Sequence, residues 1–332
     1  MVLGAISAPA ILRGLAPDEI VLGHNNKRYK LNTKWSRLDP VKYPVKDCHE
    51  MVEDKLGRII LLSNETRNNV IIYDRSGKLV KAWGHEYPGA HGLTLFNENG
   101  EDVLFICDNN RHQVIKTTVD GKVLMTLDYP IETGQYSKAE EYIPTETIIT
   151  SNGDIYVVDG YGKDFVIQYD HQGKYIRHFA GRGTGEQYVV NAHGICIDNR
   201  DKNNPHLVVT SRVENAFKLY SLDGKYLRTI PLPGAWVCRP VIQGDHLYVA
   251  VLQTNERLDE KSGFVLILDK NYKVVSNLGG NLPAYSNNVP EEMYQTIRAF
   301  QYPHDVCIDR DENLYVAQWN SGQVYPYKLS PV

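Results

Sequence analysis

The chain has 332 residues, a formal net charge of −4 and 22 tyrosines against 4 methionines. This length allows one large domain or two smaller ones, and the tyrosine bias favours strands over helices. The mild acidity argues against a nucleic-acid-binding surface, which needs clustered Lys and Arg. Five cysteines without a close pair indicate neither a disulfide framework nor a CxxC zinc site, so we expect small buried side chains.

The first 16 residues are apolar and rich in small side chains, and Ala8-Pro9-Ala10 is similar to a signal-peptidase site. The segment is too short to span a bilayer. It favours the remnant of a secretion signal, with a disordered leader as the alternative. We therefore expect a periplasmic or secreted protein, and no later segment is apolar enough to span a membrane.

A hairpin follows the leader, because two apolar runs flank the turn at Gly23-His24-Asn25-Asn26. A repeat of about 40–50 residues then begins, which is the range of propellers and solenoids. Each unit reads as a short strand, an apolar strand and a hairpin, with turns such as Ser76-Gly77-Lys78 and Asp120-Gly121-Lys122. The six units open near residues 49, 91, 144, 193, 238 and 304.

The sixth unit runs out of chain after three strands, and the N-terminal hairpin could supply the fourth. Such closure removes free sheet edges. We therefore predict an all-β fold in which residues 17–332 form one six-bladed β-propeller domain, sealed by an N-terminal strand. Two stretches, 128–142 and 277–302, do not fit the repeat. We expect them to lie over a face and shape a pocket, with a helical turn over 290–300.

Histidines recur at the start of the first strand of four units. The motifs are Cys48-His49-Glu50, Ala90-His91-Gly92, Ala192-His193-Gly194 and Pro303-His304-Asp305. First strands line the channel of a propeller, so these side chains should meet on one ring, which in the fifth blade carries Cys238 or Arg239. Neutral imidazoles suit zinc, and three protein ligands with an open position are typical of catalytic sites. The alternative is that each histidine is a separate polar residue at a strand end.

A second ring of residues follows the second strand of each blade, and it includes Tyr161 and Arg212. A tyrosine beside a metal cation can lose its proton more readily and serve as a base. An arginine can hold a carboxylate through two hydrogen bonds. The alternatives are a surface tyrosine in a turn and an arginine paired with Glu214.

The repeats resemble the NHL type, and over roughly residues 85–330 the chain resembles the peptidylglycine α-amidating lyase family. The resemblance is carried by motifs at Asp159-Gly160-Tyr161, Ala192-His193-Gly194, Ser211-Arg212 and Pro303-His304. It implies a catalytic zinc on His91, His193 and His304, with Tyr161 as base and Arg212 at the substrate anion. The family reaction splits a peptidyl-α-hydroxyglycine into a peptide amide and glyoxylate.

The chain departs from the family at three places: Gly162 and Tyr302 replace a cysteine and a methionine, and His49 replaces an arginine. His49 is therefore expected to be a fourth metal ligand or an acid/base group. We predict a metal-dependent lyase or hydrolase acting on a small molecule or short peptide, with a structural calcium ion as a possible addition. The alternatives are a non-enzymatic binding scaffold and a metal enzyme that acts on acidic sugars.

Overall fold

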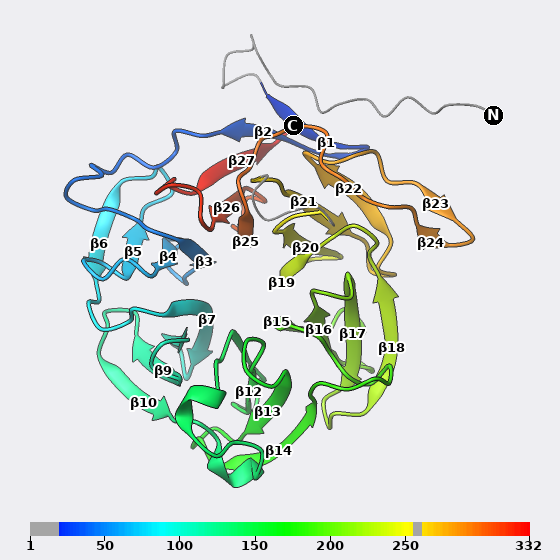
Figure 1. Cartoon of the computed structure of the whole chain (residues 1–332). Helices are drawn as coiled ribbons and strands as arrows, with labels where there is room; N and C mark the ends of the chain where they lie inside the picture. The colour runs from blue at the N-terminus through cyan, green and yellow to red at the C-terminus, as the bar shows by residue number, and fades with distance from the viewer. Residues whose placement is uncertain (1–19, 255–260) are drawn as a thin grey trace.

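The computed structural model describes residues 20–254 and 261–332, and the expected leader at residues 1–16 lies outside them. Six sheets surround a central axis; five of them place their first strand innermost, and the sixth places β25 there (Figure 1). The all-β six-bladed propeller predicted from the repeat is confirmed. No helix within the described residues is long and apolar enough to cross a membrane.

Five blades are antiparallel four-stranded sheets made of consecutive strands. The first comprises β3 (Cys48–Glu53), β4 (Ile59–Ser63), β5 (Val70–Tyr73) and β6 (Leu79–Trp83). The second comprises β7 (Ala90–Glu98), β8 (Glu101–Asp108), β9 (Gln113–Thr118) and β10 (Val123–Leu127). The third comprises β11 (Glu146–Ile149), β12 (Ile155–Val158), β13 (Phe165–Tyr169) and β14 (Tyr175–Ala180). The fourth comprises β15 (Ala192–Asp198), β16 (His206–Ser211), β17 (Ala216–Ser221) and β18 (Tyr226–Pro231), and the fifth comprises β19 (Val237–Gln243), β20 (His246–Val251), β21 (Phe264–Leu268) and β22 (Val274–Leu278).

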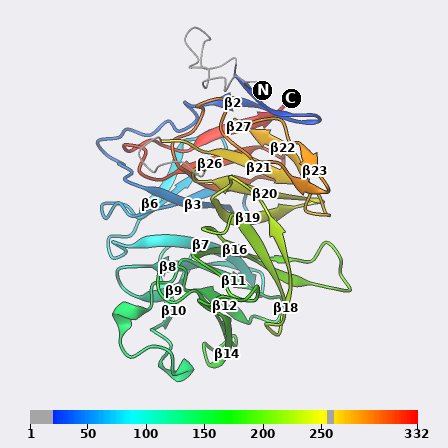
Figure 2. The same ribbon diagram turned by 45° about the vertical axis from the view of Figure 1, so that its right-hand side comes forward.

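The sixth blade joins the two ends of the chain. Its strands β25 (Pro303–Ile308), β26 (Leu314–Gln318) and β27 (Tyr327–Pro331) are followed by β2 (Lys27–Asn32) and β1 (Val21–His24). Strand β2 pairs antiparallel with β27, in a register that sets Leu31 opposite Leu329. The predicted closure by an N-terminal strand is therefore confirmed, and both ends of the described chain lie at this blade (Figure 2).

Aspartates that follow a strand fix several of the tight turns. In the first blade Asp74 Oδ1 accepts the backbone N–H of Ser76 at 2.8 Å and of Lys78 at 3.1 Å. Asp170 and Asp269 cap the same turn, between the third and fourth strands, in the third and fifth blades. Asp309 caps the turn between the first two strands of the sixth blade, β25 and β26, in the same way. Because an aspartate holds its own backbone two residues on, each hairpin register is set locally.

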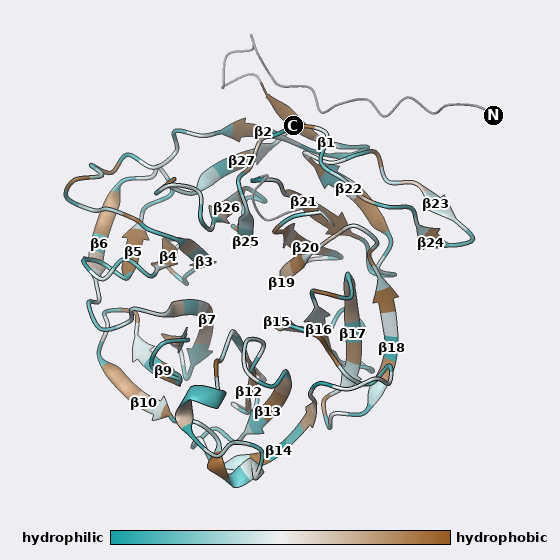
Figure 3. Ribbon diagram, in the orientation of Figure 1, coloured by the Kyte–Doolittle hydropathy of each residue, from teal (hydrophilic) through white to brown (hydrophobic). Residues whose placement is uncertain are grey.

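The hydrophobic core lies between neighbouring blades. Val208 of the fourth blade packs in one buried cluster with Val249 and Leu266 of the fifth. Hydrophobic colouring accordingly follows the strands, and hydrophilic colouring gathers in the turns (Figure 3). The five cysteines are buried and free of disulfides, as expected. Because sheet-to-sheet packing supplies the core, the axis is left available for polar side chains.

The long stretch before the sixth blade differs from its prediction. Two short strands, β23 (Tyr285–Ser286) and β24 (Val289–Pro290), form a hairpin, and the expected helical turn over 290–300 is wrong. That segment is irregular because its apolar residues are anchored separately, Met293 in one interblade cluster and Phe300 in another. The other stretch, 128–142, contains the short 3-10 turns η2 (Ile131–Thr133) and η3 (Ala139–Glu141).

Candidate metal centre

The histidines sit where the innermost strand of each blade departs from regular pairing. In β7 the register with β8 shifts between Ala90 and Leu93, so His91 lies in the irregular step. The same break occurs around His193, His304 and His49. An irregularity of this kind re-aims a side chain away from the regular strand direction. The strand starts can therefore turn imidazoles toward the axis.

The glycine that follows two of the histidines allows neighbouring blades to approach. A Cβ on Gly92 would lie 2.5 Å from the carbonyl oxygen of Thr145, and one on Gly194 would lie 2.5 Å from the Cα of Arg239. Both contacts are with the next blade. The His-Gly pairs thus combine a group that faces the axis with a position at which only hydrogen fits.

The four histidines meet in one cluster. Ring centroids of His91 lie 4.8 Å from His49, 4.8 Å from His193 and 4.9 Å from His304. His304 is in turn 4.8 Å from His49 and 4.7 Å from His193. His91 and His304 therefore form an edge shared by two triangles, one completed by His49 and the other by His193. All four side chains are buried, at 5 % exposure or less.

The His49 triangle has the geometry of a metal-binding group. One ring nitrogen from each of His49, His91 and His304 lies within 4.8 Å of the others, so these three buried residues could hold a metal ion. The sequence-based triad has His193 in place of His49. The structure brings all four rings together, but the group whose ring nitrogens lie this close to one another contains His49 and not His193, which adjoins His91 and His304 through its ring.

The shared edge is oriented by backbone carbonyls. His91 Nδ1 is 2.8 Å from the carbonyl oxygen of Thr145, and His304 Nδ1 is 3.0 Å from that of His49. A carbonyl accepts, so these nitrogens carry the protons and each ring presents the lone pair of its Nε2 for a cation or a hydrogen-bond donor. Nδ1 of His49 and of His193 are buried without a hydrogen-bond partner. Unpaired buried nitrogens are costly, and coordination of an ion would satisfy them.

Burial keeps the imidazoles neutral, which is the form that binds metals. It lowers the pKa of His49 to about 3, and it also lowers the pKa values of His91, His193 and His304. The positive charge of Arg212 acts in the same direction on each of them. The donor set therefore fits a borderline cation such as zinc.

Tyr161 lies on the His193 side of the cluster. Its hydroxyl is 3.0 Å from His193 Nε2 and 3.2 Å from His91 Nε2. The side chain is 38 % exposed overall, so it stands between solvent and the buried imidazoles. Burial raises the pKa of Tyr161, while Arg212 acts in the opposite direction. The shift toward a base that was expected beside a cation thus depends on the ion being present.

Arg212 faces the same cluster. It donates to the carbonyl oxygen of Val237 at 3.4 Å and to Cys238 Sγ at 3.1 Å, and it is buried. Glu214, its expected alternative partner, accepts instead from Ser211 and lies 3.3 Å from Lys218. The guanidinium therefore supplies positive charge beside the histidines.

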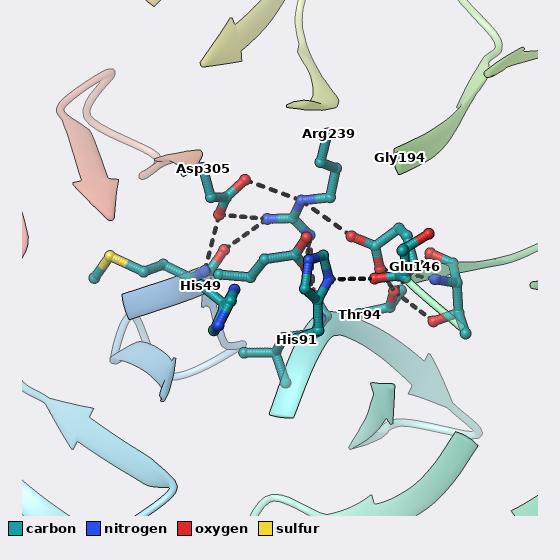
Figure 4. Close-up of polar contacts among 12 residues, drawn as sticks. His49, His91, Thr94, Glu146, Gly194, Arg239 and Asp305 are labelled. Carbon is teal, nitrogen blue, oxygen red and sulfur yellow. Dashed lines mark hydrogen bonds and ion pairs between the residues drawn. The ribbon is translucent and has the colours of Figure 1, made fainter. Parts of the chain in front are cut away.

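A second polar layer lies along the channel from the histidines. Arg239 is paired there with Asp305 at 2.7 Å, and Glu50 and Glu146 are each 3.6 Å away (Figure 4). Burial raises the pKa of Glu50 and of Glu146. This layer is not predicted from the sequence, although each of its acids directly follows a strand-start residue: His49, Thr145 or His304.

The fifth blade contributes to both layers. Its innermost strand shifts register between Val237 and Pro240, so Cys238 and Arg239 point to different levels. Cys238 lies beside Arg212 and Arg239 lies in the carboxylate layer. Beyond Arg239 lies an open pocket of about 960 Å³, whose described lining includes Arg239 and none of the four histidines. The Arg239 layer therefore separates the cluster from this pocket.

Comparison with known proteins supports a propeller with distant lyase relatives. The family described as "DUF5128: 6-bladed beta-propeller" matches residues 130–291. Peptidyl-alpha-hydroxyglycine alpha-amidating lyase 1 of Drosophila melanogaster is 25% identical over 277 residues, which cover 76% of this chain and 47% of the relative. A probable lyase of the same kind from Caenorhabditis elegans is 30% identical over 38% of this chain and 33% of its own length.

NHL repeat-containing protein 3 of Homo sapiens is 22% identical, with 63% of this chain and 59% of that protein covered. The chain thus spans about half the length of the first of these relatives, and less than two thirds of each. Among solved structures, a gluconolactonase from Xanthomonas campestris has a TM-score of 0.62 at 11% identity, covering 98% of both chains. That likeness establishes the fold alone. The expected relation to NHL and amidating-lyase propellers is confirmed as a distant one.

Proposed function

We propose that this chain is a metal-dependent lyase of the peptidyl-α-hydroxyglycine amidating type, with zinc among the four channel histidines. The observation that carries the proposal is the double triangle, in which buried neutral imidazoles from four blades share the edge His91–His304. Two Nδ1 atoms of the cluster have no hydrogen-bond partner, and backbone carbonyls orient the His91 and His304 rings. The cluster is therefore arranged to donate nitrogen lone pairs to an ion. Distant similarity to two amidating lyases supports the reaction class.

The ligand set that we propose is His91, His193 and His304, with His49 as a fourth ligand or a proton-transfer group. A bound zinc ion would act as a Lewis acid on the substrate oxygen. Within the chain, His91 and His304 hold their Nε2 atoms toward the cluster through fixed Nδ1 protons. The Arg239 layer closes the channel behind them, so substrate would approach from the side on which Tyr161 is exposed.

Tyr161 is the proposed general base. Its hydroxyl oxygen, between His91 and His193, would take the proton of the substrate's α-hydroxyl group. The carbon–nitrogen bond then breaks, the carbon becomes the aldehyde of glyoxylate, and the nitrogen receives a proton to give the amide. Arg212 would hold the carboxylate of the glyoxylate half, since its guanidinium is fixed beside the same histidines.

The setting of this activity is also a proposal. The signal-like N-terminal segment supports a periplasmic or secreted protein. The site formed by the histidines, Tyr161 and Arg212 suits a small molecule or the end of a short peptide. The similarity to an NHL repeat protein supports a second candidate, a scaffold that binds a partner without chemistry. An acidic-sugar lyase would use the same imidazoles and Arg212.

Elemental analysis of the purified full chain, followed by two activity assays, separates these candidates. We expect about one zinc per chain and release of glyoxylate from an N-acyl-α-hydroxyglycine. Metal without glyoxylate, but with unsaturated product from a uronate-containing sugar, would favour the sugar enzyme. A chain that stays metal-free after zinc supplementation would favour the scaffold and end the lyase proposal.

A further inference from the structure

The buried guanidinium of Arg239 gathers oxygen atoms from blades far apart in the sequence. It donates to the carbonyl oxygens of Leu93 and Met51, each at 2.9 Å, and to both carboxylate oxygens of Asp305, at 3.0 Å and 2.7 Å. The acceptors lie on β7, β3 and β25, while Arg239 lies on β19. One side chain thus ties four inner strands together on the axis (Figure 4).

Two further carboxylates face this group without being fully satisfied. Glu50 Oε2 and Glu146 Oε2 are each 3.6 Å from guanidinium nitrogens. Glu50 Oε1 and Glu146 Oε2 are buried and have no hydrogen-bond partner. Three carboxylates therefore surround a single positive charge, and both glutamates are 0 % exposed.

These oxygens form the kind of ligand set that a hard divalent cation uses. Calcium takes six to eight oxygen ligands from carboxylates and backbone carbonyls. The layer offers two carbonyl groups and three carboxylates, and the planar guanidinium takes the position on which they converge.

We propose that Arg239 is the built-in cation of the channel, standing where a calcium ion would otherwise join the inner strands. The wild-type chain then needs no calcium on its axis, and removal of the guanidinium creates a calcium site made of Glu50, Glu146, Asp305 and two carbonyls. This proposal does not depend on the lyase proposal, because calcium prefers oxygen ligands and the histidine cluster offers imidazole nitrogens.

Thermal unfolding of Arg239→Ala, in chelator and in calcium, tests the proposal. In chelator we expect the melting temperature to fall by roughly 5–10 °C, because the buried carboxylates lose their counter-charge. Calcium should recover at least half of that loss and should bind the variant at about one ion per chain. The wild-type protein should show no change in melting temperature with calcium and should bind no calcium. The zinc content of the variant should equal that of the wild-type protein.

Two further variants keep the test decisive. Arg58→Met removes an arginine that pairs with one carboxylate, Asp54 at 2.6 Å, and should show no calcium response. Arg239→Lys retains the charge, so it should fold even if Arg239→Ala does not, melt below wild type and remain indifferent to calcium. Calcium that stabilises wild type or Arg239→Lys as much as Arg239→Ala would overturn the proposal, as would an Arg239→Ala variant that melts at the wild-type temperature.

Discussion

Single replacement of the four channel histidines by alanine tests the geometry of the proposed metal centre. His91 and His304 belong to both triangles of imidazoles, with centroids 4.9 Å apart. His49 and His193 each belong to one. Loss of a shared residue should therefore abolish metal binding in both triangles. The effect of losing an unshared residue depends on which triangle holds the ion.

The size of each effect follows from the contacts. Outer-shell groups that orient a ligand are worth about 10–100-fold in metal affinity, so a direct ligand should cost on the order of 100-fold or more. His91→Ala and His304→Ala should lose at least this much, and His193→Ala should match them if the ion lies beside Tyr161. His49→Ala should lose less zinc affinity, about 10–100-fold. It removes an imidazole from only one triangle, and the backbone carbonyl of residue 49, which orients His304, remains.

The assay is zinc content after dialysis against a graded series of chelator buffers, with the fold of each variant checked by circular dichroism. His171→Ala, at an exposed turn position, is the matched control and should keep full zinc. Full zinc content in His193→Ala together with loss of zinc in His49→Ala would show that the ion lies in the triangle completed by His49. Full metal in all four variants would refute the reasoning altogether.

Three further predictions follow from the site. Tyr161→Phe should lower the rate of glyoxylate release by about 10²–10⁴-fold while zinc content stays constant, and an unchanged rate would remove Tyr161 as the base. Burial lowers the pKa of His49 to about 3 and also lowers that of its three neighbours, so the metal-free protein should lose stability as pH falls from about 6.5 toward about 3. In that window the unfolded state binds protons that the folded state does not, so the free energy of unfolding falls by up to about 1.4 kcal/mol per pH unit for each imidazole. A melting temperature that stays constant between about pH 7 and pH 5 would contradict the burial argument. Gly92→Ala should destabilise by about 1–3 kcal/mol in denaturant unfolding, because its Cβ would meet the Thr145 carbonyl oxygen at 2.5 Å, and a neutral effect would show that the two blades can separate there.

The sequence was sufficient for the blade count and the closure of the ring because both follow from local rules. Strand periodicity and turn chemistry recur in every unit, and the N-terminal hairpin carries the strand pattern that the last blade needs beside its third strand. The helical turn over 290–300 could not be excluded locally, because Met293 and Phe300 are held by two separate interblade clusters.

The sequence by itself also determined that four imidazoles would face one channel, since a repeated strand start must point the same way in every blade. Only the tertiary structure decided which of them share an edge, because that depends on the spacing of blades around the axis. It also placed Cys238 and Arg239 at different levels, through a register shift that no residue pattern marks. The acceptors of Arg239 lie 66, 146 and 188 residues away along the chain, so only a closed ring brings them together.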